Sequence, residues 1–299
     1  MVAQLRAVFS SNASRGREAG RRICETLRAH GIETTNYCVH TSGVSPVRRA
    51  IATATLILIS TGFSACGLSD ERRAVSTDLA PILLFNGPGT SSNDVEAIQS
   101  ILDESHLNYA IVNSFLLNAM SESQIRAHNL LIFPGGNFVR MGNSLTARTT
   151  GNIRKAVASG SNYLGICAGG FLAGSFGGGY ISLNLTSGVQ FGFYSAEGRG
   201  IRKAAVAIAS PGAPRLDQYW EDGPQFTGWG AVVGKYPDGT PAIVEGAFGS
   251  GWVILAGVHP EAPASWRRGM SFNSPVGADR AYAVTLVRAA LNGEALPHY

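Results

Sequence analysis

Residues 81–166 alternate short apolar runs with longer segments in which apolar and polar residues mix. The runs are followed by turn residues and predict buried strands, whereas the helical spacing of apolar residues in the longer segments predicts helices. Strands that alternate with helices are typical of an α/β fold with a parallel, doubly wound sheet, whose functional groups gather at the carboxyl ends of the strands. The predicted strands are 82–85, 109–112, 130–133 and 163–166, and the predicted helices are 94–104, 121–128 and 149–159.

Two of these helices have recognisable starts. Ser92 or Asn93 is expected to cap the helix over 94–104, because short polar side chains satisfy the free backbone N–H groups there. Ser121 and Gln124 form a Ser-x-x-Gln capping box that marks the start of the helix over 121–128.

After residue 176 the chain becomes glycine-rich and then rich in strand-forming residues. The predicted strands there are 204–208, 231–236, 242–244 and 252–256, and Asp238-Gly239 predicts a tight hairpin turn. We expect antiparallel edge hairpins on the same sheet, closed by a helix over 279–291. Bland roles are expected for the tryptophans, as core and rim packing, and for three cations, as a solvated face: Trp220, Trp229, Trp252 and Trp266, and Arg199, Arg202 and Lys203.

Residues 47–67 have the pattern of an export signal. Two arginines precede an uncharged apolar run over 50–63, and small residues follow it. The run has 14 residues, fewer than the roughly 20 that cross a bilayer as a helix, so a signal peptide fits better than a membrane anchor. Ser64-Ala65-Cys66 resembles the lipobox of bacterial lipoproteins, although Phe63 stands where Leu is usual. The resemblance implies a lipid on Cys66 that anchors an exported protein to a membrane of the bacterial cell envelope.

A signal peptide lies at the start of a protein, whereas 43 residues precede position 44 here. We therefore expect translation to begin at Val44 or Val47, which makes 1–43 a spurious or disordered extension. The alternative is a real basic extension, with 50–63 as a buried strand or helix. The expected organisation is a signal peptide over 44–65, a short tether over 66–80, one domain over 81–292 and a tail over 293–299.

Composition and charge exclude several classes of protein. The chain has 299 residues, of which 45% are hydrophobic and 15% charged, so it can bury one sizeable core and is not generally disordered. Residues 1–65 hold 8 Lys and Arg against 3 Asp and Glu, whereas 66–299 hold 16 against 17. Because the basic excess lies in the leader, we expect no nucleic acid partner. The sequence shows no zinc, calcium, P-loop or dinucleotide pattern, so neither a metal nor a cofactor is expected.

The strongest candidate for chemistry is Cys167, which lies between Gly165 and Gly169 after the predicted strand 163–166. The Gly-x-nucleophile-x-Gly pattern predicts a sharp strand-to-helix turn that holds the nucleophile in strained backbone geometry. The following helix start favours the thiolate and supplies backbone N–H donors. Cleavage before Cys66 would leave two cysteines, one of them lipidated, so no disulfide is expected.

A nucleophilic thiol needs a base within hydrogen-bond reach. His259 follows the apolar run 252–258, and Glu261 lies two residues further on. Residues two apart in extended backbone project to the same side, so the carboxylate could hold the imidazole while it faces the thiol. A purely structural histidine is the alternative, but the elbow at Cys167 favours the catalytic role.

A third element, Pro134-Gly135-Gly136-Asn137, follows the predicted strand 130–133. Its glycines would let backbone N–H groups converge on a developing oxyanion, and the N–H groups of Gly136 and Ala168 are the candidates for an oxyanion hole. An ordinary glycine-rich turn is the alternative for this element.

Together these elements resemble the class I glutamine amidotransferase-like superfamily and, within it, the family named for the N-terminal domain of biotin-protein ligases. The resemblance covers roughly residues 81–291 and is carried by 86–91, 164–170, 241–244 and 257–261. It implies a flavodoxin-like sheet with Cys167, His259 and Glu261 as a catalytic triad. Related intracellular proteases place a histidine directly after the nucleophile, where this chain has Ala168, which favours amidotransferase-type geometry.

The expected function is therefore hydrolysis of an amide or related acyl substrate, either a small molecule or a peptide, through a thioester on Cys167. Biotin transfer is not expected, because no ligase domain follows, and no ammonia-acceptor domain is evident in the chain. A non-catalytic binding or scaffold protein that keeps the amidotransferase fold is the alternative.

Overall fold

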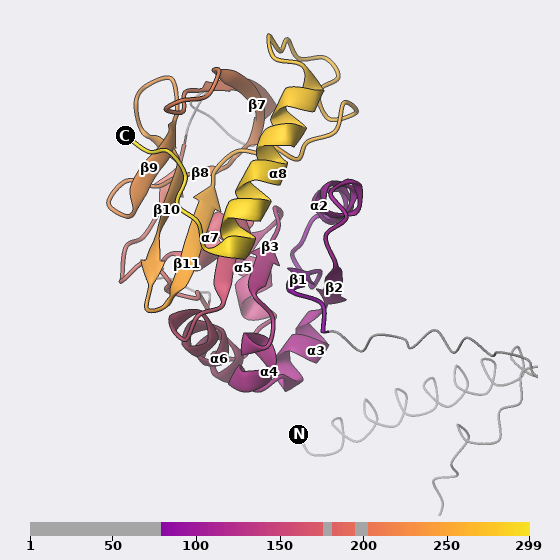
Figure 1. Cartoon of the computed structure of the whole chain (residues 1–299), viewed down its shortest axis with the longest axis vertical. Coiled ribbons are helices and arrows are strands. Elements are labelled where there is room, and N and C mark those ends of the chain that lie inside the picture. The colour runs from indigo at the N-terminus through magenta and orange to yellow at the C-terminus, as the bar shows by residue number, and fades with distance from the viewer. Residues whose placement is uncertain (1–78, 176–180, 195–202) are drawn as a thin grey trace, which may run out of the picture. The chain divides into compact units, whose positions relative to one another are not determined.

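A seven-stranded sheet organises the part of the chain that the computed structural model describes, residues 79–175, 181–194 and 203–299 (Figure 1). The strand order is β2-β1-β3-β4-β11-β10-β9. The first five strands are parallel, in the flavodoxin-like order, and the last two are antiparallel additions, so the predicted fold class is confirmed. The bounds are β1 (Ile82–Phe85), β2 (Tyr109–Val112), β3 (Leu130–Phe133), β4 (Asn162–Ile166), β9 (Ala231–Lys235), β10 (Pro241–Phe248) and β11 (Gly251–Ala256).

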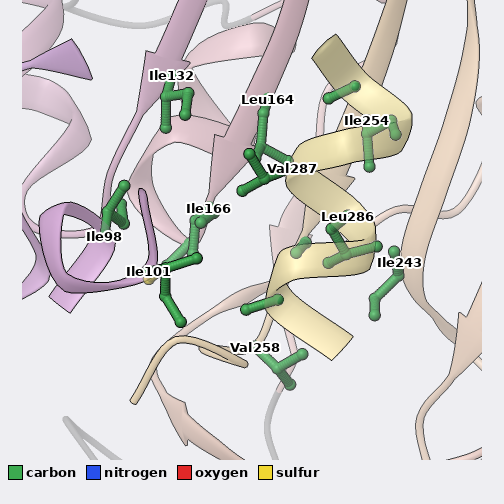
Figure 2. Packing of buried hydrophobic residues seen from close by; sticks show 14 of the residues in the cluster. Ile98, Ile101, Ile132, Leu164, Ile166, Ile243, Ile254, Val258, Leu286 and Val287 are labelled. Atoms are coloured by element: carbon green, nitrogen blue, oxygen red, sulfur yellow. The ribbon is translucent and has the colours of Figure 1, made fainter. Parts of the chain in front are cut away.

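The alternation of side chains along each strand divides the core into two layers. Ile82 and Leu84 pack on one face of the sheet, and Leu83 and Phe85 pack on the other. Helices α2 (Ser92–Glu104) and α8 (Val276–Asn292) cover the first face, and Figure 2 shows Ile98 of α2 and Leu286 of α8 among the residues packed there. The second face is covered by α3 (Ser114–Ala119), α4 (Glu122–Arg126), α6 (Ala147–Ala158) and α7 (Ala168–Ala173).

The expected helix starts are partly right. The capping box of Ser121 and Gln124 is present at α4. The cap of α2 is Ser91 rather than Ser92 or Asn93, because it is the Ser91 side chain that accepts a hydrogen bond from the backbone N–H of Asp94. Two short helices were not predicted from the sequence, α3 and α5 (Phe138–Asn143).

The second half forms more than one sheet. The hairpin at Asp238-Gly239 joins β9 to β10, and Gly239 has the positive φ of 89° that such a turn needs. The expected strand 204–208 does not join the main sheet, because β6 (Lys203–Ile208) pairs along its whole length with β7 (Leu216–Glu221). A further small pair consists of β5 (Gly192–Phe193) and β8 (Pro224–Gln225).

The last residues of the chain lie along the added strands. The backbone N–H of Leu296 donates to the buried Glu245 carboxylate at 2.9 Å, and that of Tyr299 donates to the carbonyl of Val232 at 2.9 Å. The segment expected as a tail therefore makes backbone hydrogen bonds with β9 and β10 strand residues.

The expectations for 1–43, for the signal peptide over 44–65 and for Cys66 concern residues outside the described part of the chain. Across the described ranges, no helix is both long and apolar enough to cross a membrane.

Candidate active site

A cavity of about 790 Å³ opens at the carboxyl ends of the parallel strands. The strand order reverses between β1 and β3, and such a switch point is where doubly wound sheets bind ligands. The loops after these two strands meet there, since Ser91 N–H donates to the Gly135 carbonyl at 3.0 Å and Asn137 N–H donates to that of Gly89 at 2.7 Å. The sequence candidates Cys167, His259, Gly136 and Ala168 all line this cavity.

Cys167 lies in the strained turn that the sequence predicts. Its backbone angles are φ 49° and ψ −104°, between β4 and α7, and the residue is 7% exposed. Gly169 permits the turn, because a Cβ there would lie 2.0 Å from the carbonyl oxygen of Phe133. Non-glycine residues with such angles persist only where the surroundings enforce them, and they cluster at functional sites.

The Cys167 thiol donates a long hydrogen bond to the carbonyl of Glu221, with Sγ and O 3.7 Å apart. Within the described residues no hydrogen bond joins Sγ to His259, although both side chains line the cavity. Catalytic hydrogen bonds are often long or absent in ligand-free sites and form when the substrate is bound.

His259 is positioned by β7, a strand that the sequence patterns did not indicate. The backbone N–H of His259 donates to the carbonyl of Tyr219 at 2.8 Å. The imidazole lies edge-on to the rings of Tyr219 and Trp266, at centroid distances of 5.7 and 5.8 Å. The ring is therefore fixed by packing as well as by its polar contacts.

The Nδ1 atom of His259 faces two carboxylates. Glu261 Oε1 lies 2.9 Å away in hydrogen-bonding geometry, as the His-x-Glu spacing suggests, and Asp94 Oδ1 lies 3.1 Å away. The exposed fractions are 4% for His259, 1% for Glu261 and 6% for Asp94. Because Nδ1 is engaged by acceptors, Nε2 is the nitrogen left to exchange a proton with the thiol.

Negative charge dominates the electrostatics of the imidazole. Burial by itself lowers the pKa of His259, but the charges of Cys167, Glu261 and Asp94 outweigh it and raise this pKa well above its ordinary value. Burial raises the pKa of Glu261, and His259 only partly opposes that effect. Burial also raises the pKa of Asp94, yet His259 and the hydrogen bonds from Ser91 and its own backbone leave it below the usual value.

The two oxyanion-hole candidates keep free backbone donors. In the described chain, neither the N–H of Gly136 nor that of Ala168 donates to a protein acceptor. Gly136 has φ 135°, and a Cβ there would lie 2.2 Å from the carbonyl oxygen of Gly89. The glycine is thus required where the two loops meet.

Asp94, His259 and Glu261 are also the described residues that could hold a metal ion, since their ligand atoms all lie within 4.8 Å of one another. However, the separations from Nδ1 to the two carboxylates are hydrogen-bond lengths, and a shared proton accounts for them.

The walls of the cavity include residues whose expected roles were bland. Trp266 lines the cavity, and Lys203 lies there with its Nζ 3.3 Å from Glu221, so these two expectations were wrong. The reason is that β7 carries Glu221 to the cavity and β6 follows beside it. Phe138, Phe171 and Phe193 form an aromatic wall, with ring centroids 4.5–6.1 Å apart.

A family model described as "Biotin-protein ligase, N terminal" matches residues 80–210. Residues 80–210 belong to this family. The resemblance stated from the sequence is confirmed, and the protein carries an amidotransferase-like domain of the biotin-protein ligase N-terminal type. No curated protein matches the chain.

Several solved structures have low similarity to the chain. Gan42B, a GH42 β-galactosidase, is 13% identical with a TM-score of 0.46; the match covers 73% of this chain, which spans about a third of Gan42B, 31%. A cytoplasmic protein from Salmonella typhimurium is 13% identical, with a TM-score of 0.41 and coverage of 70% and 98%. A candidate GMP synthase protein from Thermoplasma acidophilum is 11% identical, with a TM-score of 0.44 and coverage of 71% and 96%.

Proposed function

We propose that the protein hydrolyses a carbon–nitrogen amide bond, or a related acyl bond, through a thioester on Cys167. The observation that carries this proposal is the shared cavity, in which a cysteine in strained elbow geometry and a carboxylate-bound histidine lie at the switch point of the sheet. Perturbed titratable groups beside a nucleophile in a cavity are typical of catalytic sites.

In the first step, Nε2 of His259 takes the proton of the Cys167 thiol as Sγ attacks the acyl carbon. A C–S bond forms, and the negative charge that develops on the acyl oxygen is met by the N–H groups of Gly136 and Ala168. The C–N bond then breaks as the imidazolium returns the proton to the leaving nitrogen.

In the second step, water attacks the thioester and gives a proton to His259. The C–S bond breaks, an acid is released, and the proton returns to sulfur. Glu261 orients the imidazole through Nδ1 in both steps. The substrate class is a small-molecule or peptide amide.

The direct test is amide hydrolysis by the purified protein, measured as released ammonia or amine over a panel of glutamine, other primary amides and short peptides. Cys167→Ala should abolish turnover, and Cys38→Ala is the matched control, since it removes a cysteine outside the described residues. Hydrolysis that persists in Cys167→Ala would refute the proposal.

A non-catalytic binding or scaffold protein is the second candidate, and the hydrogen bond from the thiol to Glu221 rather than to His259 favours it. Binding of a panel amide without turnover, unchanged in Cys167→Ala, would support this alternative.

We also propose that the protein is exported and carries a lipid on Cys66, on the basis of the Ser64-Ala65-Cys66 pattern. Intact-mass analysis of membrane-extracted protein tests this. A mass that begins at lipid-modified Cys66 would support it, whereas an unmodified start at Met1 would contradict it.

A further inference from the structure

Asp94 is absent from the triad suggested by the sequence, yet its carboxylate lies against the same imidazole. The chain brings it there from the first turn of α2, directly after the β1 loop, whereas His259 follows β11. The separation of Oδ1 from Nδ1 is 3.1 Å, only 0.2 Å longer than that for Glu261. Gly135 makes this approach possible, because a Cβ there would lie 2.1 Å from Asp94 Oδ1 and 2.7 Å from His259 Cε1.

The number of protons does not match the number of acceptors. Nδ1 of His259 carries a single hydrogen, but carboxylates face it from two sides. Asp94 Oδ1 and Glu261 Oε2 are buried and accept no hydrogen bond from the described residues. Buried carboxylate oxygens without donors are costly, so positive charge on the imidazole offsets a cost that a neutral ring leaves in place.

The titratable groups that face His259 come from four segments: Asp94 from α2, Cys167 from the elbow, Tyr219 from β7 and Glu261 from its own segment. Of the two carboxyl groups, Asp94 has the lowered pKa and Glu261 the raised one. Arg280 of α8 reaches only the backbone carbonyl of Glu261, at 3.4 Å. Asp94 therefore supplies a negative charge to the ring that no described cation next to it cancels.

We propose that ionised Asp94 is a positioning residue of this site, which holds Nδ1–H of His259 together with Glu261 and stabilises the imidazolium. Its part in turnover rests on the proposed function. When Sγ gives its proton to Nε2, the ring gains one positive charge, and Asp94 stabilises that charged state through space without taking the proton.

The test is the imidazolium titration of His259 in the full chain, followed by NMR of ¹⁵N-labelled histidine. Asp94→Asn keeps the shape of the side chain but removes its charge. Asp103→Asn on the exposed side of the same helix is the matched control. We expect the pKa of His259 to fall by about one unit or more in Asp94→Asn and to stay unchanged in Asp103→Asn.

A second readout is the rate of Cys167 alkylation by iodoacetamide at mildly acidic pH, which should fall about tenfold in Asp94→Asn if the imidazolium supports the thiolate. Neither readout requires a substrate, so failure of amide hydrolysis and failure of this inference are distinguishable.

A structural role of Asp94 at the start of α2 predicts a different result. Loss of a first-turn carboxylate would lower the melting temperature but leave the pKa of His259 unchanged, which would overturn the proposal. Stoichiometric zinc binding that survives dialysis and is lost in Asp94→Asn would also overturn it, because the three side chains would then be metal ligands.

Discussion

Gly135→Ala perturbs the site without a change in charge or chemistry. A methyl group at this position would lie 2.1 Å from Asp94 Oδ1 and 2.7 Å from His259 Cε1, whereas Cβ contacts below 3.0 Å are essentially never found. The φ angle of Gly135 is not positive, so backbone strain adds nothing. The carboxylate must therefore retreat by roughly 1 Å from its place beside the imidazole.

The expected effects on stability and on chemistry differ in size. Overpacking of a buried site costs about 1–3 kcal/mol, and here the displaced atoms belong to side chains, which can partly adjust. A catalytic group displaced by about 1 Å can lose about 10²-fold in rate. We therefore expect a modest loss of stability and a much larger loss of Cys167 alkylation at mildly acidic pH and of any turnover.

Gly151→Ala is the matched control for this substitution. Gly151 lies inside α6, and a Cβ at this position would meet nothing within 4 Å, so alanine there should raise stability by about 0.5–1 kcal/mol through helix propensity and leave reactivity unchanged. Urea unfolding and alkylation rates measure both variants. Parent-like reactivity in Gly135→Ala would refute the close packing of Asp94, His259 and Gly135.

Two further predictions test electrostatics and substrate contact. Burial raises the pKa of Asp279 from 3.8 to about 6, against the opposing effects of Ser274 and Arg267. The folded state therefore holds the proton more tightly, so this group's stabilising contribution is complete below pH 3.8 and is lost as pH rises through about 6. The difference in unfolding free energy between the parent and Asp279→Asn should accordingly shift in favour of the variant between these pH values, and a constant difference would contradict this. Phe193, 57% exposed on the aromatic wall, should contact apolar groups of a substrate, so Phe193→Ala should raise KM about fivefold for apolar amides with little change in kcat. An equal loss for all amides would contradict that role.

The sequence predicts the parallel part of the fold well because its strands are buried on both faces. Runs such as Ile82–Phe85 and Leu130–Phe133 are wholly apolar, and the structure places β1 and β3 at those residues. By contrast, β7 contains Asp217 and Gln218, which are buried although polar. A strand of this composition has no apolar pattern to detect, so the element that positions His259 was missed.

The candidate site was predictable only where a local pattern carries the chemistry. The elbow at Cys167 and the contact between His259 and Glu261 depend on residues close in sequence, and the structure shows the expected strain and hydrogen bond. Asp94 carries no such pattern, because an acidic residue in the first turn of a helix is common for reasons of helix stability. Its contact with His259 arises only when the loops after β1 and β11 are brought to one edge of the sheet.

The measurement that tests the central claim most directly is the rate of Cys167 alkylation by iodoacetamide as a function of pH, located by mass spectrometry of its peptide. It compares the parent, His259→Ala and the control His298→Ala, whose histidine does not line the cavity. A free thiol is largely protonated below about pH 8. We predict rapid alkylation of the parent and of the control well below that pH, and loss of this reactivity in His259→Ala. A thiol that reacts slowly below about pH 8 in the parent, or that is unaffected by the loss of His259, would contradict an assembled nucleophile and base.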